Sequence, residues 1–244
     1  MTDFTSWTLD GTATAFSDGF TYSRLALNLV EPGGARGSAF APAPLFLEFN
    51  QPFGFRFNFF IPVSIDLRGD GLTFTLAGTP GLGDGGSGLG YQGLGADSIA
   101  FAVDTFHFDS EPVSPSVQIL QGGSVTPLAA TVTGLGDSIR DPNYQWRAEI
   151  DYAPSGLVDN SGLLSFRIVH LNLGTFEVQS TIDFGALGMV GNPVHYGFTA
   201  ANGAALDGHF ITSAAPIPEP GSVALLLAGL GVVGWRARRR LWAR

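Results

Sequence analysis

Apolar and polar residues alternate with a period of two along several stretches of the sequence, and this pattern constrains the fold more than any other feature. Every second residue from 53 to 59 is Phe, and shorter alternating runs cover residues 72–76, 146–152 and 164–168. A period of two places the apolar side chains of a strand on one face, as in half-buried antiparallel strands. The sequence therefore predicts an all-β protein in which two antiparallel sheets pack face to face as a sandwich.

Turn-forming residues separate these runs and complete the expected domain organisation. They are Gly33-Gly34, Gly69-Asp70-Gly71, Gly81 to Gly95, Asp141-Pro142-Asn143 and Asp159-Asn160-Ser161-Gly162. Residues 1–213 contain no amphipathic helical pattern and no repeat of 20–50 residues. We expect one sandwich domain over residues 1–213, a Pro-rich linker over 214–221, and a short apolar helix with an Arg-rich tail over 222–244.

The C-terminal tail has a distinctive order: Pro218-Glu219-Pro220, an apolar run from Val223 to Trp235, and a cluster of Arg. The apolar run is shorter than the roughly 20 residues that span a bilayer, and basic residues after it would hold that end in the cytoplasm. This order resembles the bacterial PEP-CTERM sorting signal. The resemblance implies a transient inner-membrane anchor, cleavage near Pro218-Glu219-Pro220 by an exosortase-type enzyme, and a body that is released or attached outside the cell. The alternative, an ordinary core helix, would not normally end in so many Arg.

The N-terminal residues do not match this expectation of export. An exported protein begins with a basic and then apolar signal peptide, whereas Met1 to Asp18 are polar and strand-like. We therefore expect either a start upstream of this sequence or a leader that it omits.

Charge and cysteine content exclude several functions. The chain has no Cys, which excludes disulfides, thiolate metal sites and a cysteine nucleophile. Residues 1–218 contain seven Arg, no Lys and 20 acidic residues, which gives a net charge of −13. Such an acidic body would be repelled by phosphate backbones, so we expect no nucleic-acid partner. Acidic, oxygen-rich loops instead suit a hard cation such as calcium.

Three segments carry a family resemblance when taken in order: Gly69 to Phe74, Gly85 to Tyr91 and Ser98 to Phe106, with weaker similarity at Glu111 to Ile119 and Gly197 to Gly203. Together they resemble the L-type lectins, the family of the legume seed lectins and of cargo lectins in the early secretory pathway. The resemblance extends over about residues 4–213. It implies a concanavalin-like jelly roll, and it implies carbohydrate binding without catalysis.

The resemblance also assigns a sugar site. Asp70 corresponds to the carboxylate that accepts hydrogen bonds from sugar hydroxyls, and in the family the peptide before it is cis. Gly86 and Ser87 lie where a backbone N–H reaches a hydroxyl, and Gly203 and Ala204 belong to the loop that shapes specificity. Asp109 is expected to replace an Asn that binds both calcium and sugar. Without the other segments, Asp70-Gly71 would be interpreted as a hairpin turn.

A calcium site follows from the same resemblance. Its expected ligands are Asp104, the backbone carbonyl of Phe106, Asp109 and Glu111, although Asp109 and Glu111 could equally be solvated loop charges. No transition metal is expected, because the residues that hold it in legume lectins correspond here to Ala102 and Ser116, and neither binds metal ions.

Two other patterns suggest enzymes but are incomplete. Gly83 to Gly93 matches the dinucleotide fingerprint twice, yet no helix pattern follows it. Glu149-Ile150-Asp151 is similar to the catalytic strand of glycosidases with a related sandwich, but no second carboxylate follows within the required spacing.

The sequence thus favours a calcium-dependent, non-catalytic protein that binds carbohydrate, such as the cell's own exopolysaccharide, at the cell surface or in the extracellular matrix. A structural surface or biofilm-matrix protein with a degenerate lectin sandwich is the alternative. A glycoside hydrolase acting on β-glucan is a third hypothesis.

Overall fold

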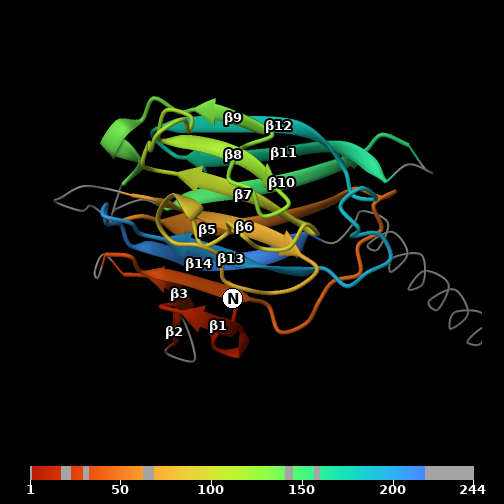
Figure 1. The fold of residues 1–244 in the computed structure, drawn as a ribbon, viewed down its shortest axis with the longest axis horizontal. Coiled ribbons are helices and arrows are strands. Elements are labelled where there is room, and N and C mark those ends of the chain that lie inside the picture. Colours follow the sequence, from red (N-terminus) through yellow and green to blue (C-terminus); the bar gives the residue numbers. More distant parts are fainter. Residues whose placement is uncertain are drawn as a thin grey trace, which may run out of the picture.

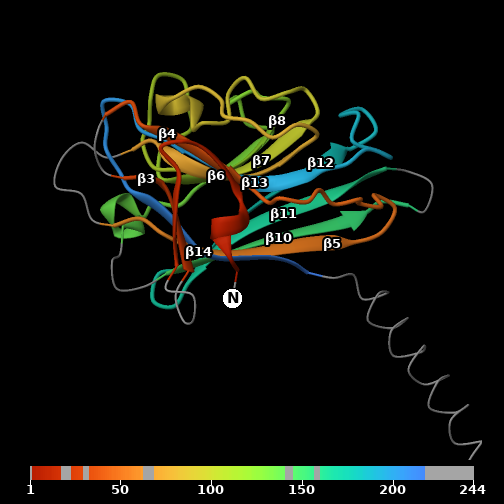
Figure 2. The same ribbon diagram turned by 90° about the horizontal axis from the view of Figure 1, so that it is seen from below.

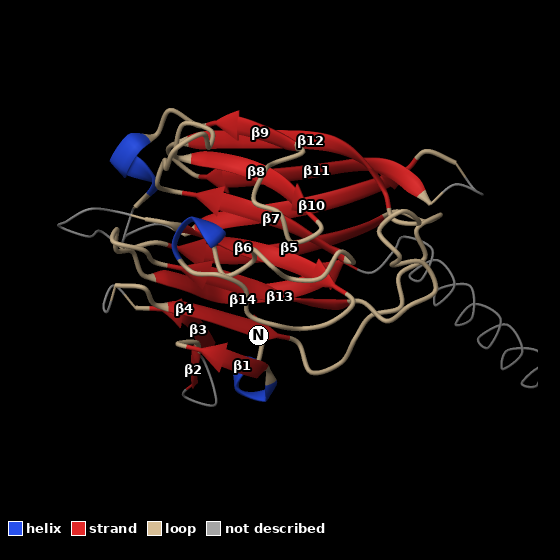
Figure 3. Cartoon of the chain, viewed as in Figure 1, coloured by secondary structure: helices blue, strands red, loops and turns tan. Residues whose placement is uncertain are grey.

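The structure, a computed structural model, describes residues 2–17, 23–29, 33–62, 69–140, 145–156 and 160–217. These residues form two seven-stranded antiparallel sheets that pack face to face (Figures 1 and 2). The helices among them are three short 3-10 turns, η1 (Phe4–Ser6), η2 (Gly86–Gly88) and η3 (Gly136–Ile139) (Figure 3). The predicted all-β sandwich is confirmed.

Strands that are distant in sequence are neighbours in both sheets. The first sheet has the order β1-β4-β13-β6-β7-β8-β9, and the second has the order β12-β11-β10-β5-β14-β3-β2. The strands of the first sheet are β1 (Thr8–Gly11), β4 (Arg36–Phe40), β6 (Gly71–Ala77), β7 (Ser98–Asp104), β8 (Ser116–Gln121), β9 (Ala129–Val132) and β13 (His195–Ala201). The strands of the second sheet are β2 (Thr14–Ser17), β3 (Ser23–Asn28), β5 (Phe53–Phe60), β10 (Trp146–Pro154), β11 (Ser161–His170), β12 (Gly174–Asp183) and β14 (His209–Ile217).

The alternating Phe row of β5 supplies much of the core between the sheets. Phe53, Phe55, Phe57 and Phe59 are all buried, while Arg56 between them is only half-buried. Phe57 stacks on Phe74 of the first sheet with ring centroids 5.6 Å apart. Aromatic contacts of this kind add to the burial of apolar area, so the Phe row both fixes the register of β5 and joins the two sheets.

Strands β6 and β7 differ from the half-buried pattern that the sequence predicts. Every residue of both strands is buried, including Thr73 and Thr75 of the face expected to be polar. The Gly-rich segment between the strands folds over the outer face, where Leu89 and Tyr91 pack against Ala100 and Ala102. Thr73 satisfies its hydroxyl within the sheet by bonding to Thr75 and Thr199.

The last strand continues farther than the sequence suggests. Strand β14 pairs with β5 through Ile217, so residues 214–217 lie in the sheet, although the sequence analysis placed them in a linker. The expected apolar helix over 222–244 and the cleavage motif at 218–220 lie outside the described residues. Within the described part of the chain, no helix has the length and apolar character needed to cross a membrane.

Candidate functional site

The register of the first sheet brings the predicted site segments to one edge. Gly71 at the start of β6 pairs with Asp104 at the end of β7 and with Ala201 at the end of β13. Neighbouring antiparallel strands reverse direction, so the start of one strand meets the ends of the two beside it. Asp70 therefore lies between the loop that follows Asp104 and the loop that follows Ala201.

Asp70 is held from both sides by its own backbone. Its N–H donates to the carbonyl of Ala201 at 3.1 Å, and its carbonyl accepts the N–H of Thr105 at 2.8 Å. The Gly69-Asp70 peptide is cis. Gly69 packs so closely on Phe106 that a Cβ at this position would lie 2.3 Å from the Cβ of Phe106. Glycine is thus required before Asp70.

The Asp70 carboxylate lies where three predicted site residues meet. A Cβ on Gly203 would come within 3.1 Å of Asp70 Oδ2 and within 3.4 Å of the Cα of Gly86. The N–H of Gly203 is directed at the carboxylate, whereas Oδ2 is buried without a hydrogen bond of ordinary geometry. The structure therefore brings Asp70, Gly86 and Gly203 together and leaves an acceptor oxygen among them.

Burial and neighbouring charge oppose ionisation of this carboxylate. Burial raises the pKa of Asp70 to about 6, the Gly203 N–H lowers it, and the charges of Glu111 and Asp207 raise it further. A hydroxyl donor or a nearby cation would offset part of this unfavourable burial.

Asp104 is also buried, and protein donors occupy both of its oxygens. Oδ1 accepts from the backbone N–H of Phe106 at 3.0 Å and from Ser114 Oγ at 2.8 Å. Oδ2 accepts from Gln118 Nε2 at 2.8 Å. The same Gln118 amide donates to Ser116 Oγ at 2.9 Å, so it bridges Asp104 and Ser116. Burial raises the pKa of Asp104 to about 7 despite these donors.

The other predicted site residues do not form a single cluster with Asp70 and Asp104. Glu111 accepts the N–H of Phe108 at 3.0 Å and is hydrogen-bonded by Ser87, which links the two site loops. Burial raises the pKa of Glu111. Asp109 and Ala204 are exposed. No group of three or more His, Asp or Glu able to hold a metal ion occurs among the described residues.

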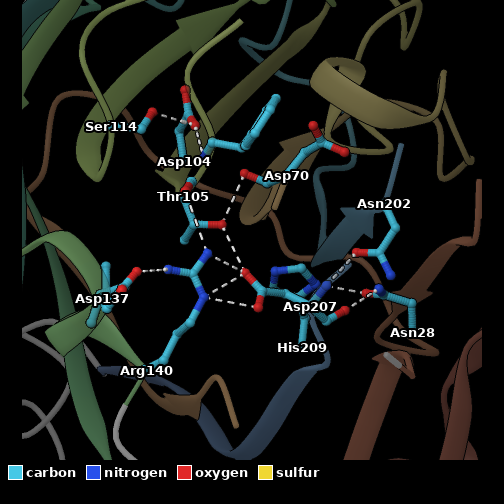
Figure 4. Close-up of polar contacts among 12 residues, drawn as sticks. Asn28, Asp70, Asp104, Thr105, Ser114, Asp137, Arg140, Asn202, Asp207 and His209 are labelled. Atoms are coloured by element: carbon cyan, nitrogen blue, oxygen red, sulfur yellow. Dashed lines mark hydrogen bonds and ion pairs between the residues drawn. The ribbon is translucent and has the colours of Figure 1, made fainter. Parts of the chain in front are cut away.

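A buried ion pair lies directly beneath the site and was not anticipated from the sequence. Arg140 follows η3, and its Nε donates to the two carboxylate oxygens of Asp207 at 2.9 and 3.0 Å (Figure 4). The side chains of Arg140 and Asp207 are 3% and 0% exposed, so water cannot screen the pair. Thr105 joins it to the site, because its Oγ1 lies 3.2 Å from both Asp207 Oδ2 and the carbonyl of Asp70.

The same network continues into the second sheet. The N–H of Asp207 donates to Asn202 Oδ1 at 3.2 Å, and Asn28 Nδ2 donates to the carbonyl of Asp207 at 2.8 Å. Asn28 Oδ1 also lies 2.8 Å from Nδ1 of His209. Burial and the charge of Arg140 lower the pKa of His209 to about 3. The loop over residues 203–208 is therefore fixed from below by both sheets.

Little in the sequence could have revealed this network. Asp207 and Arg140 are 67 residues apart, and no local motif joins them. The one available signal is that Arg140, one of only seven basic residues in residues 1–218, follows the apolar Ile139. If such an Arg is buried, it requires a carboxylate partner.

The comparisons with known proteins concern the C-terminal motif and the fold. The PEP-CTERM protein-sorting motif matches residues 216–240. Among solved structures, the basic winged bean lectin with Tn-antigen is 22% identical, covers 87% of this chain and 92% of its own, and has a TM-score of 0.69. Lectin I from Ulex europaeus, in complex with the methyl glycoside of α-L-fucose, is 21% identical, covers 86% and 91%, and has a TM-score of 0.71.

A third solved structure comes from outside the seed lectins. The exoplasmic/lumenal domain of VIP36, in its Ca²⁺/Man3GlcNAc-bound form, is 16% identical, covers 87% of this chain and 83% of its own, and has a TM-score of 0.64. No curated protein sequence matches the chain. The fold is that of the legume lectins. The chain joins this lectin-like sandwich to a C-terminal PEP-CTERM sorting motif.

Proposed function

We propose that this chain is a calcium-dependent, non-catalytic carbohydrate-binding protein, exported and sorted to the bacterial cell surface or extracellular matrix. The observation that carries the proposal is the Asp70 carboxylate, which is buried beside Gly86 and Gly203 with Oδ2 free of ordinary hydrogen bonds. A buried acceptor without a donor is unfavourable, and a sugar hydroxyl is the kind of donor that satisfies it.

Each site residue has a role in this proposal. Asp70 accepts from a sugar hydroxyl, and the backbone N–H groups of Gly86, Ser87 and Ala204 donate to sugar oxygens. Gly203 allows close approach, since a side chain there would press on Asp70 Oδ2. Asp109 is exposed and is proposed to contact both calcium and sugar.

The loop after Asp104 carries oxygen ligands of the kind that calcium prefers, and binding would have to draw Asp104, Asp109 and Glu111 together, because the described residues do not gather them into a metal cluster. Asp104 and Glu111 are carboxylates whose burial raises their pKa values, and Phe106 and Asp109 add oxygen donors from the same loop. Calcium prefers oxygen ligands of this kind, and when bound it would supply positive charge that stabilises the ionised carboxylates. In this proposal Asp104, Phe106, Asp109 and Glu111 hold the ion, and Thr105 connects their loop to Asp70.

A glycan array probed with the full chain, in calcium and in chelator, tests the proposal. We expect binding to a defined group of glycans that is lost in chelator. Absence of binding in both conditions would favour the second candidate, a structural matrix protein with a degenerate sandwich. The bonding of both Asp104 oxygens to protein donors is the observation that favours this second candidate.

The structure gives Glu149, the candidate catalytic residue of the glycosidase hypothesis, a place in a cluster of ion pairs. Its carboxylate, 8% exposed, is surrounded by Arg56, Arg147 and Arg167 on the outer face of the second sheet. We expect wild-type protein to hydrolyse no β-glucan, and we expect Glu149→Gln to retain wild-type glycan binding at the Asp70 site, because Glu149 lies on the opposite sheet. Reducing-sugar release by wild type that disappears in Glu149→Gln would contradict the non-enzyme proposal.

The sorting motif supports export and processing. In this proposal the binding domain extends through β14, the sorting motif begins at the end of this strand, and residues 222–244 interact with the inner membrane before cleavage by an exosortase-type enzyme. We expect the exported, mature protein to lack residues beyond about 221. Intact-mass analysis of the cell-surface fraction checks this, and a mass that still includes Arg236 to Arg244 would contradict it.

A further inference from the structure

A pocket of about 560 Å³ lies on the second sheet, away from Asp70. Strands β5, β10 and β14 and the N-terminal residue Thr2 line it. The sheet register explains its shape, because Asn58 of β5 pairs with Arg147 on one side and with Ser213 on the other. Small residues of β14, Ser213 and Ala215, thus lie beside long Arg side chains, and the difference in size forms the hollow.

The charged side chains that line this pocket are both cationic. They are Arg56 and Arg147, and the lining contains no Asp or Glu. Arg56 is held in place by the carbonyl of Ile150 at 2.8 Å and by Asp151 at 2.7 Å. Arg147 is held by Glu149, whose carboxylate lies outside the lining, so the two guanidinium groups reach the pocket while acidic neighbours balance part of their charge.

Three polar side chains of the pocket have hydrogen-bonding capacity that no other described residue satisfies. Arg147 is 60% exposed and contacts Glu149 through Nε at 2.8 Å, while its two terminal nitrogens have no acceptor among the described residues. Asn58 and Ser213 line the same pocket, and neither side chain has a hydrogen-bond partner in the described part of the chain. A guanidinium fork next to an amide and a hydroxyl is suited to a ligand that carries both a carboxylate and hydroxyl groups.

We propose that this pocket is a second carbohydrate site, selective for a saccharide that carries a carboxylate, such as a uronic acid unit. Its volume lies within the range of small-molecule sites, roughly 300–1,000 Å³. Arg147 binds the carboxylate, and Asn58 and Ser213 bind neighbouring hydroxyls. The acidic body repels densely charged polyanions. A polysaccharide with isolated carboxylates is therefore a better ligand than a heavily charged one.

Calorimetric titration of the full chain with a glucuronic acid disaccharide and with its neutral glucose counterpart tests this site. We expect wild type to prefer the acidic disaccharide, and Arg147→Ala to weaken its binding by roughly tenfold or more, as for a lost charged hydrogen bond. Arg147→Lys keeps the charge without the fork, so it should restore part of the affinity. Ala215→Phe fills the hollow without changing charge, and it should also abolish binding.

The matched controls separate this site from the one at Asp70. Arg36→Ala and Asp84→Ala each remove an exposed charge on the opposite side of the sandwich, and both should bind the acidic disaccharide as wild type does. Equal affinity of wild type for the two disaccharides, or unchanged binding by Arg147→Ala, would overturn the second site and leave the Asp70 proposal standing.

Discussion

Asp207→Ala is expected to lower the free energy of unfolding by about 3–5 kcal/mol, the usual cost of removing one partner from a buried ion pair. The variant leaves the Arg140 guanidinium, 3% exposed, without its buried carboxylate partner and, among the described residues, with only the exposed carboxylate of Asp137 at 3.9 Å. It also removes an acceptor of Thr105 Oγ1, and so loosens the contact that supports the Asp70 carbonyl. Urea denaturation followed by fluorescence measures the change.

Two comparisons make this result specific. Arg140→Met combined with Asp207→Leu replaces both charges by apolar groups, which commonly recovers most of the stability. Asp151→Ala breaks the more exposed pair with Arg56, whose side-chain exposures are 27% and 44%, and should cost less than about 1 kcal/mol. If Asp207→Ala costs no more than Asp151→Ala, the buried pair does not support the site.

Asp104→Ala should abolish the calcium-induced rise in melting temperature, and with it glycan binding. A ligand that binds only the folded state stabilises it by roughly 3 kcal/mol at a hundredfold excess over its dissociation constant. Asp104 is the most buried of the proposed calcium ligands that carry a charge, so its loss removes a ligand that water cannot replace. Asp104→Asn, which keeps the size of the side chain, guards against a simple folding defect, and Asp84→Ala is the control for an exposed acid.

The calcium-induced stabilisation should depend on pH, and the pKa of Asp104 sets the sign of this dependence. Burial raises the pKa of Asp104 from 3.8 to about 7, so in chelator the folded protein holds this proton more tightly than the unfolded chain does. The contribution of Asp104 to stability therefore falls as pH rises from about 4 to about 7. Calcium requires the ionised form, so its stabilising effect should be larger at pH 8 than at pH 5.5. An equal calcium response at both values would exclude Asp104 as a ligand.

The sequence predicts the sandwich well because the Phe row of β5 and the alternation in β10 and β11 report directly on burial. It predicts β6 and β7 less well, because their second buried face depends on where the Gly-rich segment over residues 78–97 folds. The end of β14 was missed for a similar reason: Pro216 and Ile217 pair with β5, and this pairing cannot be inferred from a Pro-rich stretch alone.

In the candidate site, too, local sequence predicts some residues, while others are brought in only by the fold. Local segments indicated Asp70, Gly86 and Gly203. The sheet register brings Asp70 and Gly203 together, and the folding of the Gly-rich segment adds Gly86. The contacts that fix them, through Thr105, Arg140 and Asp207, join residues that are far apart in sequence, so only the fold places them together.

The most direct test of the account is titration of the best glycan from the array into wild type and Asp70→Asn, each in calcium and in chelator. We predict saturable binding by wild type in calcium alone, and none by Asp70→Asn, which should keep the calcium-induced rise in melting temperature. Equal glycan affinity of Asp70→Asn and wild type would contradict the central claim, because the buried Asp70 carboxylate would then not be the sugar acceptor.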